Sequence, residues 1–141
     1  MRLMKLILAA MLLATPVSFG SAVKAHADSC WDHNGSLMRL TDQGQQRWFY
    51  YENPRQALAN AGVTRGTLLF DGRNAGDYYA GTARVFSRFC PGNPLEYYVE
   101  GPVTRNPLRI TMRGTRDANQ QCRNTGNLVT DTLVFTYVRD C

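Results

Sequence analysis

The chain has 141 residues, of which 44% are hydrophobic and 19% charged, and its formal net charge is +5. Arg2, Lys5 and Lys24 lie in an N-terminal export signal without acidic residues, so the remainder of the chain carries only +2. A charge this small excludes the strongly basic composition typical of nucleic-acid-binding proteins, and the length suits a single domain.

The first 27 residues have the pattern of a secretory signal peptide. Basic residues precede the apolar run Leu6–Leu13, and small residues then lead to the A-x-A sequence Ala25-His26-Ala27. Pro16 and Gly20 interrupt the apolar run before it is long enough to span a membrane. We therefore predict a signal peptide at residues 1–27, cleavage after Ala27, and export to the periplasm or the extracellular space, with no transmembrane segment in the mature chain.

Two strands are predicted near the start of the mature chain. Ser36–Thr41 places Met38 and Leu40 on one face, and Asp42-Gln43-Gly44 forms a turn after it. Gln46–Glu52 follows with aromatic residues on both faces, which indicates burial on one side and packing or ligand contact on the other.

A short helix is predicted at Gln56–Ala61. Asn53 is a good N-cap, Pro54 fits the first helical position, and Gly62 is a typical C-terminal stop. A helix this short is not stable alone, so we expect it to pack on a barrel end or a sheet face.

Two further strands are predicted at Thr64–Asp71 and Asp77–Phe89. The odd positions of the second strand are apolar or small and are expected to face inward; they are Tyr79, Gly81, Ala83, Val85 and Phe89. The small residues Gly81 and Ala83 indicate a tight bend or a close approach of backbone.

Leu95–Val103 and Leu108–Gly114 alternate with a period of two residues and predict a β-hairpin. If the hairpin folds about Thr104-Arg105, Glu100 lies opposite Arg109 and the apolar residues share the other face. Thr-Arg is poor chemistry for a two-residue turn, so a four-residue loop remains an alternative.

The last part of the chain is predicted as a polar loop, Thr115–Asn127, followed by a strand at Leu128–Arg139. About seven short strands separated by turns indicate an all-β protein, a small antiparallel meander barrel or sandwich with one short helix and two disulfides. Pairing of the first strand with the last would remove both exposed edges. Residues 28–141 are expected to form this single β-domain.

All four cysteines follow the predicted cleavage site, which indicates two disulfides formed in an oxidising compartment. Closure of the predicted hairpin favours Cys90–Cys122 and leaves Cys30–Cys141 to join the first strand to the last. The alternative pairs Cys30 with Cys90 and Cys122 with Cys141.

Few residues indicate catalysis. Asp32-His33-Asn34-Gly35-Ser36 contains an acid, a histidine and a hydroxyl, but consecutive side chains point in different directions, so we interpret it as a turn. Glu96 and Glu100 share a strand face, where pairing with arginines is favoured over a glycosidase-like carboxylate pair. The cysteine spacing does not suggest a metal site. We therefore expect no catalytic residue, no cofactor and no metal.

Exposed aromatic and arginine side chains are the candidate binding groups. Aromatic residues on a barrel surface can stack on sugars or anchor a protein, and arginines can contact anions. The candidates are Trp48, Tyr50, Tyr98, Arg109 and Arg113. The predicted function is a non-enzymatic binding module for a protein or a cell-envelope glycan. An envelope-acting hydrolase and a structural envelope protein without a small ligand are the alternatives.

The sequence also resembles a group of small exported bacterial proteins that have no assigned activity. The resemblance lies in short motifs around turns: Trp31, His33–Ser36, Met38, Tyr51, Pro54-Arg55, Gly66–Gly72, Gly81–Ala83, Asp131, Leu133 and Phe135. It implies export and a compact β-domain, and it implies no catalytic residue.

Overall fold

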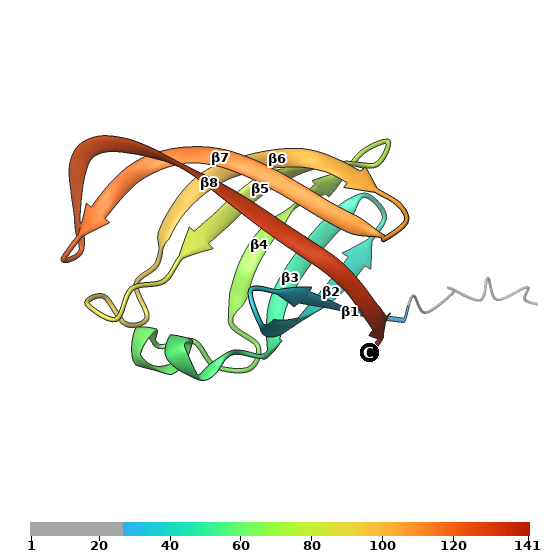
Figure 1. The fold of residues 1–141 in the computed structure, drawn as a ribbon, viewed down its shortest axis with the longest axis horizontal. Helices are drawn as coiled ribbons and strands as arrows, with labels where there is room; N and C mark the ends of the chain where they lie inside the picture. Colours follow the sequence, from blue (N-terminus) through green and yellow to red (C-terminus); the bar gives the residue numbers. More distant parts are fainter. Residues whose placement is uncertain (1–26) are drawn as a thin grey trace, which may run out of the picture.

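The computed structural model describes residues 27–141, which form a closed antiparallel barrel of eight strands (Figure 1). The strands are β1 (Ser29–His33), β2 (Ser36–Gln43), β3 (Gln46–Asn53), β4 (Leu68–Asn74), β5 (Tyr78–Val85), β6 (Leu95–Thr104), β7 (Arg109–Gln120) and β8 (Arg123–Asp140). They follow one another around the barrel in chain order. The all-β prediction is confirmed, and the architecture is a barrel. The predicted signal peptide, apart from Ala27, lies outside the described residues.

Strand β1 is the element that the sequence prediction did not include. Asn34 and Gly35 both have positive φ, 51° and 80°, which is the conformation of a two-residue hairpin turn. The predicted turn is therefore correct, but it connects β1 to β2. The alternation in β1 is hidden because a bulge shifts the register of its pairing with β8 between Cys30 and Trp31.

The barrel closes between β1 and β8, as expected. Ser29 pairs with Asp140, and the Cys30–Cys141 disulfide joins Cα atoms 5.0 Å apart beside this pairing. The Cys90–Cys122 disulfide is also formed. Both predicted disulfides are thus confirmed, and the alternative pairing is wrong.

The short helix lies where it was predicted, as the 3-10 helix η1 (Gln56–Ala61) between β3 and β4. Gly62 ends it with a φ of 80°, as expected. The predicted N-cap is wrong: Asn53 still pairs with Leu37 of β2, so the helix begins later and Arg55 is its N-cap residue.

The β6–β7 hairpin has a different register from the one predicted. Thr104 pairs with Arg109, and Glu100 pairs with Arg113 instead of Arg109, so residues 105–108 form the four-residue loop that was the alternative. Pro107 has no N–H to donate to a ladder, which prevents the strands from pairing closer to the turn.

The boundaries of β4 and β5 also differ from the prediction. β4 begins at Leu68 because Thr64 and Thr67 form a turn in which the Thr67 N–H donates to the Thr64 carbonyl. β5 ends at Val85, and Phe89, predicted to face inward, is 56% exposed.

The predicted polar loop Thr115–Asn127 is wrong, because β7 and β8 continue through it as a paired hairpin. Gln121 and Cys122 form its turn with φ values of 50° and 66°. We call residues 115–130 the arm. Figure 1 shows the arm extending past the other strands and curving over one end of the barrel. The polar sequence reflects exposure on both faces of a strand pair.

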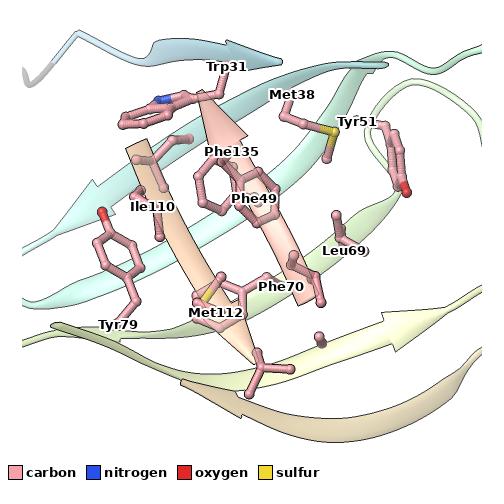
Figure 2. Packing of buried hydrophobic residues seen from close by; sticks show 14 of the residues in the cluster. Trp31, Met38, Phe49, Tyr51, Leu69, Phe70, Tyr79, Ile110, Met112 and Phe135 are labelled. Carbon is pink, nitrogen blue, oxygen red and sulfur yellow. The ribbon is translucent and has the colours of Figure 1, made fainter. Parts of the chain in front are cut away.

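Interdigitated aromatic and aliphatic side chains fill the barrel (Figure 2). Phe49 and Phe135 stack with ring centroids 4.0 Å apart, and Trp31 meets Phe49 edge-on at 6.0 Å. Phe49 and Phe135 are completely buried. The middle of the barrel is therefore packed, and space for a ligand has to be found toward an end. No helix within residues 27–141 is long and apolar enough to cross a membrane.

The predicted close approach at Gly81 is confirmed. Gly81 pairs with Gly72 of β4, and a Cβ atom on Gly81 would lie 2.2 Å from the Asp71 carbonyl oxygen and 2.5 Å from the Gly72 Cα. The two strands can pack this closely only because both residues lack a side chain.

Replacing Gly81 with Ala should therefore destabilise the barrel. Because the Cβ would meet rigid backbone, we expect the free energy of unfolding to fall by about 2–3 kcal/mol, measured by urea denaturation. Thr82→Ala, a change at the neighbouring position, is the control. If Gly81→Ala is as stable as the wild type, β4 and β5 can move apart at this position without loss of free energy of unfolding.

Candidate functional site

The two ends of the barrel differ in their side chains. At the end formed by the β2–β3, β4–β5 and β6–β7 turns, the Arg47 guanidinium donates to the carbonyl oxygens of Gly44 and Gln46, both at 2.8 Å. Tyr79 lies beside Arg47, and burial raises the pKa of its hydroxyl. These side chains occupy that end with contacts to the protein itself.

The other end contains a pocket of about 380 Å³, which we call the mouth pocket. Residues from β1, from β3 to β8, and from η1 and its flanking loops line it. Its polar lining residues include His33, Tyr51, Arg55, Tyr97, Arg116 and Asp131. Its apolar lining includes Leu58, Leu69, Phe86 and Leu133. The volume is within the range of small-molecule sites.

His33 is a buried polar residue of the mouth pocket, with 8% of its surface exposed. Its ring stacks on Phe135 with centroids 4.5 Å apart, and Nδ1 lies 2.9 Å from the Val134 carbonyl oxygen. Because a carbonyl can only accept, Nδ1 carries the proton and donates it. Burial lowers the pKa of His33, so the ring is neutral and Nε2 is a hydrogen-bond acceptor. No described residue donates to Nε2.

Acidification should destabilise the protein through His33. Because burial lowers the pKa of the folded residue below 6.5, the unfolded chain binds more protons as the pH falls from 6.5 through the folded pKa. The free energy of unfolding should therefore fall over that range. In His33→Asn the side-chain N–H can still donate to Val134, but this titration is absent. Urea denaturation of both proteins from about pH 7.5 to about pH 5 tests this prediction. If the free energy of unfolding depends on pH equally in the variant and the wild type, His33 is not the cause.

Tyr51 and Arg55 provide donors in the lining of the pocket. Tyr51 is 4% exposed, its hydroxyl has no hydrogen bond to a described residue, and burial raises its pKa to about 12, so it remains a donor at neutral pH. The Arg55 backbone N–H donates to Ser36 Oγ at 3.0 Å, which attaches the loop before η1 to the start of β2. The Arg55 guanidinium forms no ion pair with a residue of the described part of the chain.

The remaining wall is a cluster of Tyr97, Arg116 and Asp131. Arg116 donates to both carboxylate oxygens of Asp131, from Nε at 2.5 Å and from Nη2 at 3.4 Å, and its guanidinium lies 5.8 Å from the centroid of the Tyr97 ring. Burial, followed by the Asp131 charge, raises the pKa of Tyr97. Asp131 is therefore an acceptor oriented by Arg116 rather than a free base.

Arginines dominate the charge of the mouth pocket. Arg55, Arg84 and Arg116 line it, against the single carboxylate of Asp131. Asp71 and Glu96 neutralise Arg84 at 2.6 and 3.3 Å, and Asp131 neutralises Arg116. Arg55 supplies the excess positive charge. Within residues 27–141 there is no group of His, Cys, Asp and Glu side chains suited to hold a metal ion.

The five candidate binding residues from the sequence do not gather at this site. Trp48 and Tyr50 lie on the outer face of β3, while Tyr98, Arg109 and Arg113 lie on the outer faces of β6 and β7. Tyr98 is exposed and donates to Glu100, which pairs with Arg113. None of the five lines the mouth pocket.

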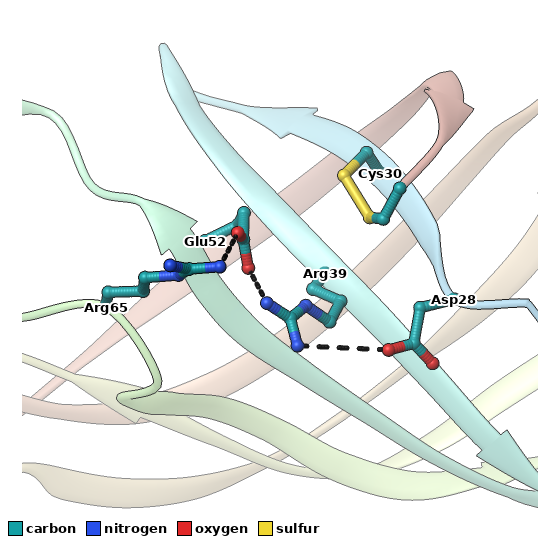
Figure 3. Close-up of polar contacts among 6 residues, drawn as sticks. Asp28, Cys30, Arg39, Glu52 and Arg65 are labelled. Atoms are coloured by element: carbon teal, nitrogen blue, oxygen red, sulfur yellow. Dashed lines mark hydrogen bonds and ion pairs between the residues drawn. A yellow bond between two sulfur atoms is a disulfide. The ribbon is translucent and has the colours of Figure 1, made fainter.

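The outer face of the barrel is rich in ion pairs between neighbouring strands. In Figure 3, Arg39 lies between Asp28 and Glu52, and Arg65 also contacts Glu52 at 2.5 Å. Hydrogen bonds from Arg39, and then from Arg65, lower the pKa of Glu52. Arginines on this face therefore bind carboxylates of the same chain, as Arg84 binds Glu96.

The residues of the mouth pocket were missed because they lie far apart in the sequence. A signal was present: His33 ends one strand, Tyr51 and Asp131 lie in others, and closure of an antiparallel barrel brings alternate strand ends to one rim. Identifying that rim requires the β1 strand and the correct length of β8, and both were absent from the prediction.

No protein-family model matches the chain, and no curated protein matches its sequence. Three solved structures have a similar fold. Apo short afifavidin is 18% identical with a TM-score of 0.54, and the match covers 81% of this chain and 97% of that chain. The rhizavidin–biotin complex is 16% identical with a TM-score of 0.53, covering 82% and 95%. Intact apo afifavidin is 15% identical with a TM-score of 0.51, covering 82% and 84%. These identities establish similarity of fold alone.

Proposed function

We propose that this protein is an exported, non-enzymatic binding protein whose mouth pocket takes a small organic molecule. The observation that carries the proposal is a pocket of about 380 Å³ into which the otherwise buried residues His33 and Tyr51 each present a polar atom that has no partner among the described residues. Small-molecule sites typically combine an apolar lining with a few such polar groups, which fix the orientation of the ligand. The two disulfides support an oxidising compartment.

The arrangement favours binding over catalysis. Ser36 Oγ accepts from the Arg55 backbone, and no hydrogen bond joins it to His33. Asp131 is held by Arg116. A nucleophile, its base and an orienting acid are therefore not aligned with one another, as acyl transfer would require.

The chemistry of the lining describes the ligand. His33 Nε2 accepts a hydrogen bond, the Tyr51 hydroxyl donates one, and Arg55 attracts an anion. A cyclic urea or amide presents an N–H and a carbonyl side by side. The N–H would donate to His33 Nε2, and the carbonyl would accept from the Tyr51 hydroxyl. A carboxylate would complement the arginine. We therefore propose a ligand with a cyclic urea or amide, an apolar body and a carboxyl group, present as the carboxylate or as its amide, whose oxygen accepts from Arg55. This replaces the protein or glycan predicted from the outer-face residues.

Biotin is the first compound to test, since it carries a cyclic urea and a carboxylate and is the ligand in the rhizavidin structure. Isothermal titration calorimetry of the wild type should show one biotin site. Tyr51→Phe should weaken binding by about tenfold, because it removes one hydrogen bond to a buried group. Arg55→Gln should weaken it by a similar factor and remove most of its salt dependence.

Tyr50→Phe and Arg65→Gln are matched controls, because each removes the same group from the outer face close to the pocket residues. Both should bind biotin as the wild type does. Absence of a biotin site in the wild type would reject the cyclic-urea ligand. Equal weakening in the controls would place the site outside the mouth pocket.

A further inference from the structure

Two further cavities lie next to the mouth pocket and are lined in part by the arm. The first, of about 350 Å³, shares Val85, Phe86 and Arg116 with the mouth pocket. The second, of about 300 Å³, shares Cys90, Asn93, Leu95 and Asn119 with the first. The three spaces therefore lie next to one another along these shared side chains. We call the part beyond Arg116 the arm cleft.

The two walls of the arm cleft come from different parts of the chain. The β5–β6 loop with the adjoining ends of β5 and β6 forms one wall, and the arm forms the other. In Figure 1 both segments lie at the end of the barrel that holds η1. The Cys90–Cys122 disulfide joins the walls across Cα atoms 5.6 Å apart. The bond therefore fixes the spacing of the two walls in the free protein, so a ligand would have less to order on binding.

The lining changes character along the cleft. Next to the mouth pocket the side chains of Val85, Phe86 and Leu95 are apolar. Farther out the cleft is lined by Asn93, Asn119 and Asn124, whose carboxamides form no hydrogen bond with a described residue. Each carboxamide can both donate and accept, as a peptide-like amide does. Charged side chains other than Arg116 and Arg88 are absent from the lining residues.

We propose that the arm cleft binds a chain attached to the ligand, an aliphatic segment followed by neutral amide groups, so that the physiological ligand is an amide conjugate and the mouth pocket holds only its head. This rests on the proposed function of the mouth pocket. The aliphatic segment contacts Val85, Phe86 and Leu95, and the amides pair with Asn93 and Asn119.

Three compounds test the proposal by calorimetry: biotin, biotin methylamide, and biotin linked through an amide to the side chain of Nα-acetyl-lysine methylamide. The two amides lack the carboxylate equally, so their difference measures the chain alone. We expect the lysine conjugate to bind about tenfold more tightly than the methylamide, which corresponds to two modest hydrogen bonds. The Asn93→Ala/Asn119→Ala variant should lose that difference and keep its affinity for the methylamide. The control Asn60→Ala/Asn127→Ala should retain both.

The outcomes separate the two proposals. If biotin binds but the two amides bind equally, or if the difference survives in Asn93→Ala/Asn119→Ala, the arm cleft does not bind the chain and the mouth pocket proposal stands. If none of the three compounds binds the wild type, the proposed function fails for this head group and the conjugate proposal fails with it.

Discussion

Replacing Cys30 and Cys141 together with alanine is expected to lower the free energy of unfolding by about 4–5 kcal/mol. The bond joins residues separated by 111 positions, so it restricts almost the whole unfolded chain. In the folded protein it lies where β1 closes on β8, next to the Ser29–Asp140 pair. Its loss should therefore also increase fraying of β1, the shortest strand of the barrel.

Urea denaturation of the double variant measures the loss, and hydrogen exchange of the β1 and β8 amides locates it. The Cys90→Ala/Cys122→Ala variant is the comparison, because its bond spans only 32 positions and should contribute about 1 kcal/mol less. If removal of Cys30–Cys141 lowers the free energy of unfolding less than removal of Cys90–Cys122, the entropy of the unfolded chain is not the main source of the stabilisation by these disulfides.

The sequence was sufficient for the fold because its strongest signals are local. Alternation in Leu95–Thr104 and Arg109–Gly114 survives in β6 and β7, even though the register between them differed by four residues. Alternation determines which face of a strand is buried, and a shift by an even number of residues keeps every side chain on the same face. Strand assignment was therefore robust to an error that changed the cross-strand pairs.

The site could not be predicted in the same way because it depends on closure. In β3 the aromatic residues occupy both faces, and the pattern alone does not tell whether Trp48 and Tyr50 or Phe49 and Tyr51 point inward. The structure turns Phe49 and Tyr51 inward, because they share a face with the buried Met38 and Leu40 across the β2–β3 ladder. Of the candidate aromatic residues, only Tyr98 is exposed, while Trp48 and Tyr50 are half-buried, and all three lie on the face away from the pocket.

The arm was the other long-range element that the sequence concealed. Gln120 to Asn127 is polar, and polar sequence without alternation predicts a loop. A hairpin that leaves the barrel has no buried face, so the signal that identifies other strands is lost. The Cys122 disulfide was the one correct indication that this segment is held close to Cys90.

The second large effect is expected at Phe135, whose ring is the link between the barrel core and the mouth pocket. It is fully buried and stacks on two rings. Its ring centroid lies 4.0 Å from that of Phe49 and 4.5 Å from that of His33. Removing it leaves a cavity that rigid β-strands cannot fill by collapse. We expect Phe135→Ala to lower the free energy of unfolding by about 3–5 kcal/mol.

Phe135→Leu keeps most of the volume and should lose less, about 1–2 kcal/mol, so it remains folded if the alanine variant does not. Phe89→Ala is the matched control: the same side chain is 56% exposed there, and its removal should change stability by no more than about 0.5 kcal/mol.

Because the His33 ring stacks on Phe135, the leucine variant should also raise the pKa of His33 toward 6.5, as NMR titration of its ring protons would show. A Phe135→Ala variant as stable as Phe89→Ala would show that the stacked rings do not stabilise the barrel. An unchanged pKa of His33 in Phe135→Leu would show that packing of the core does not affect His33 in the mouth pocket.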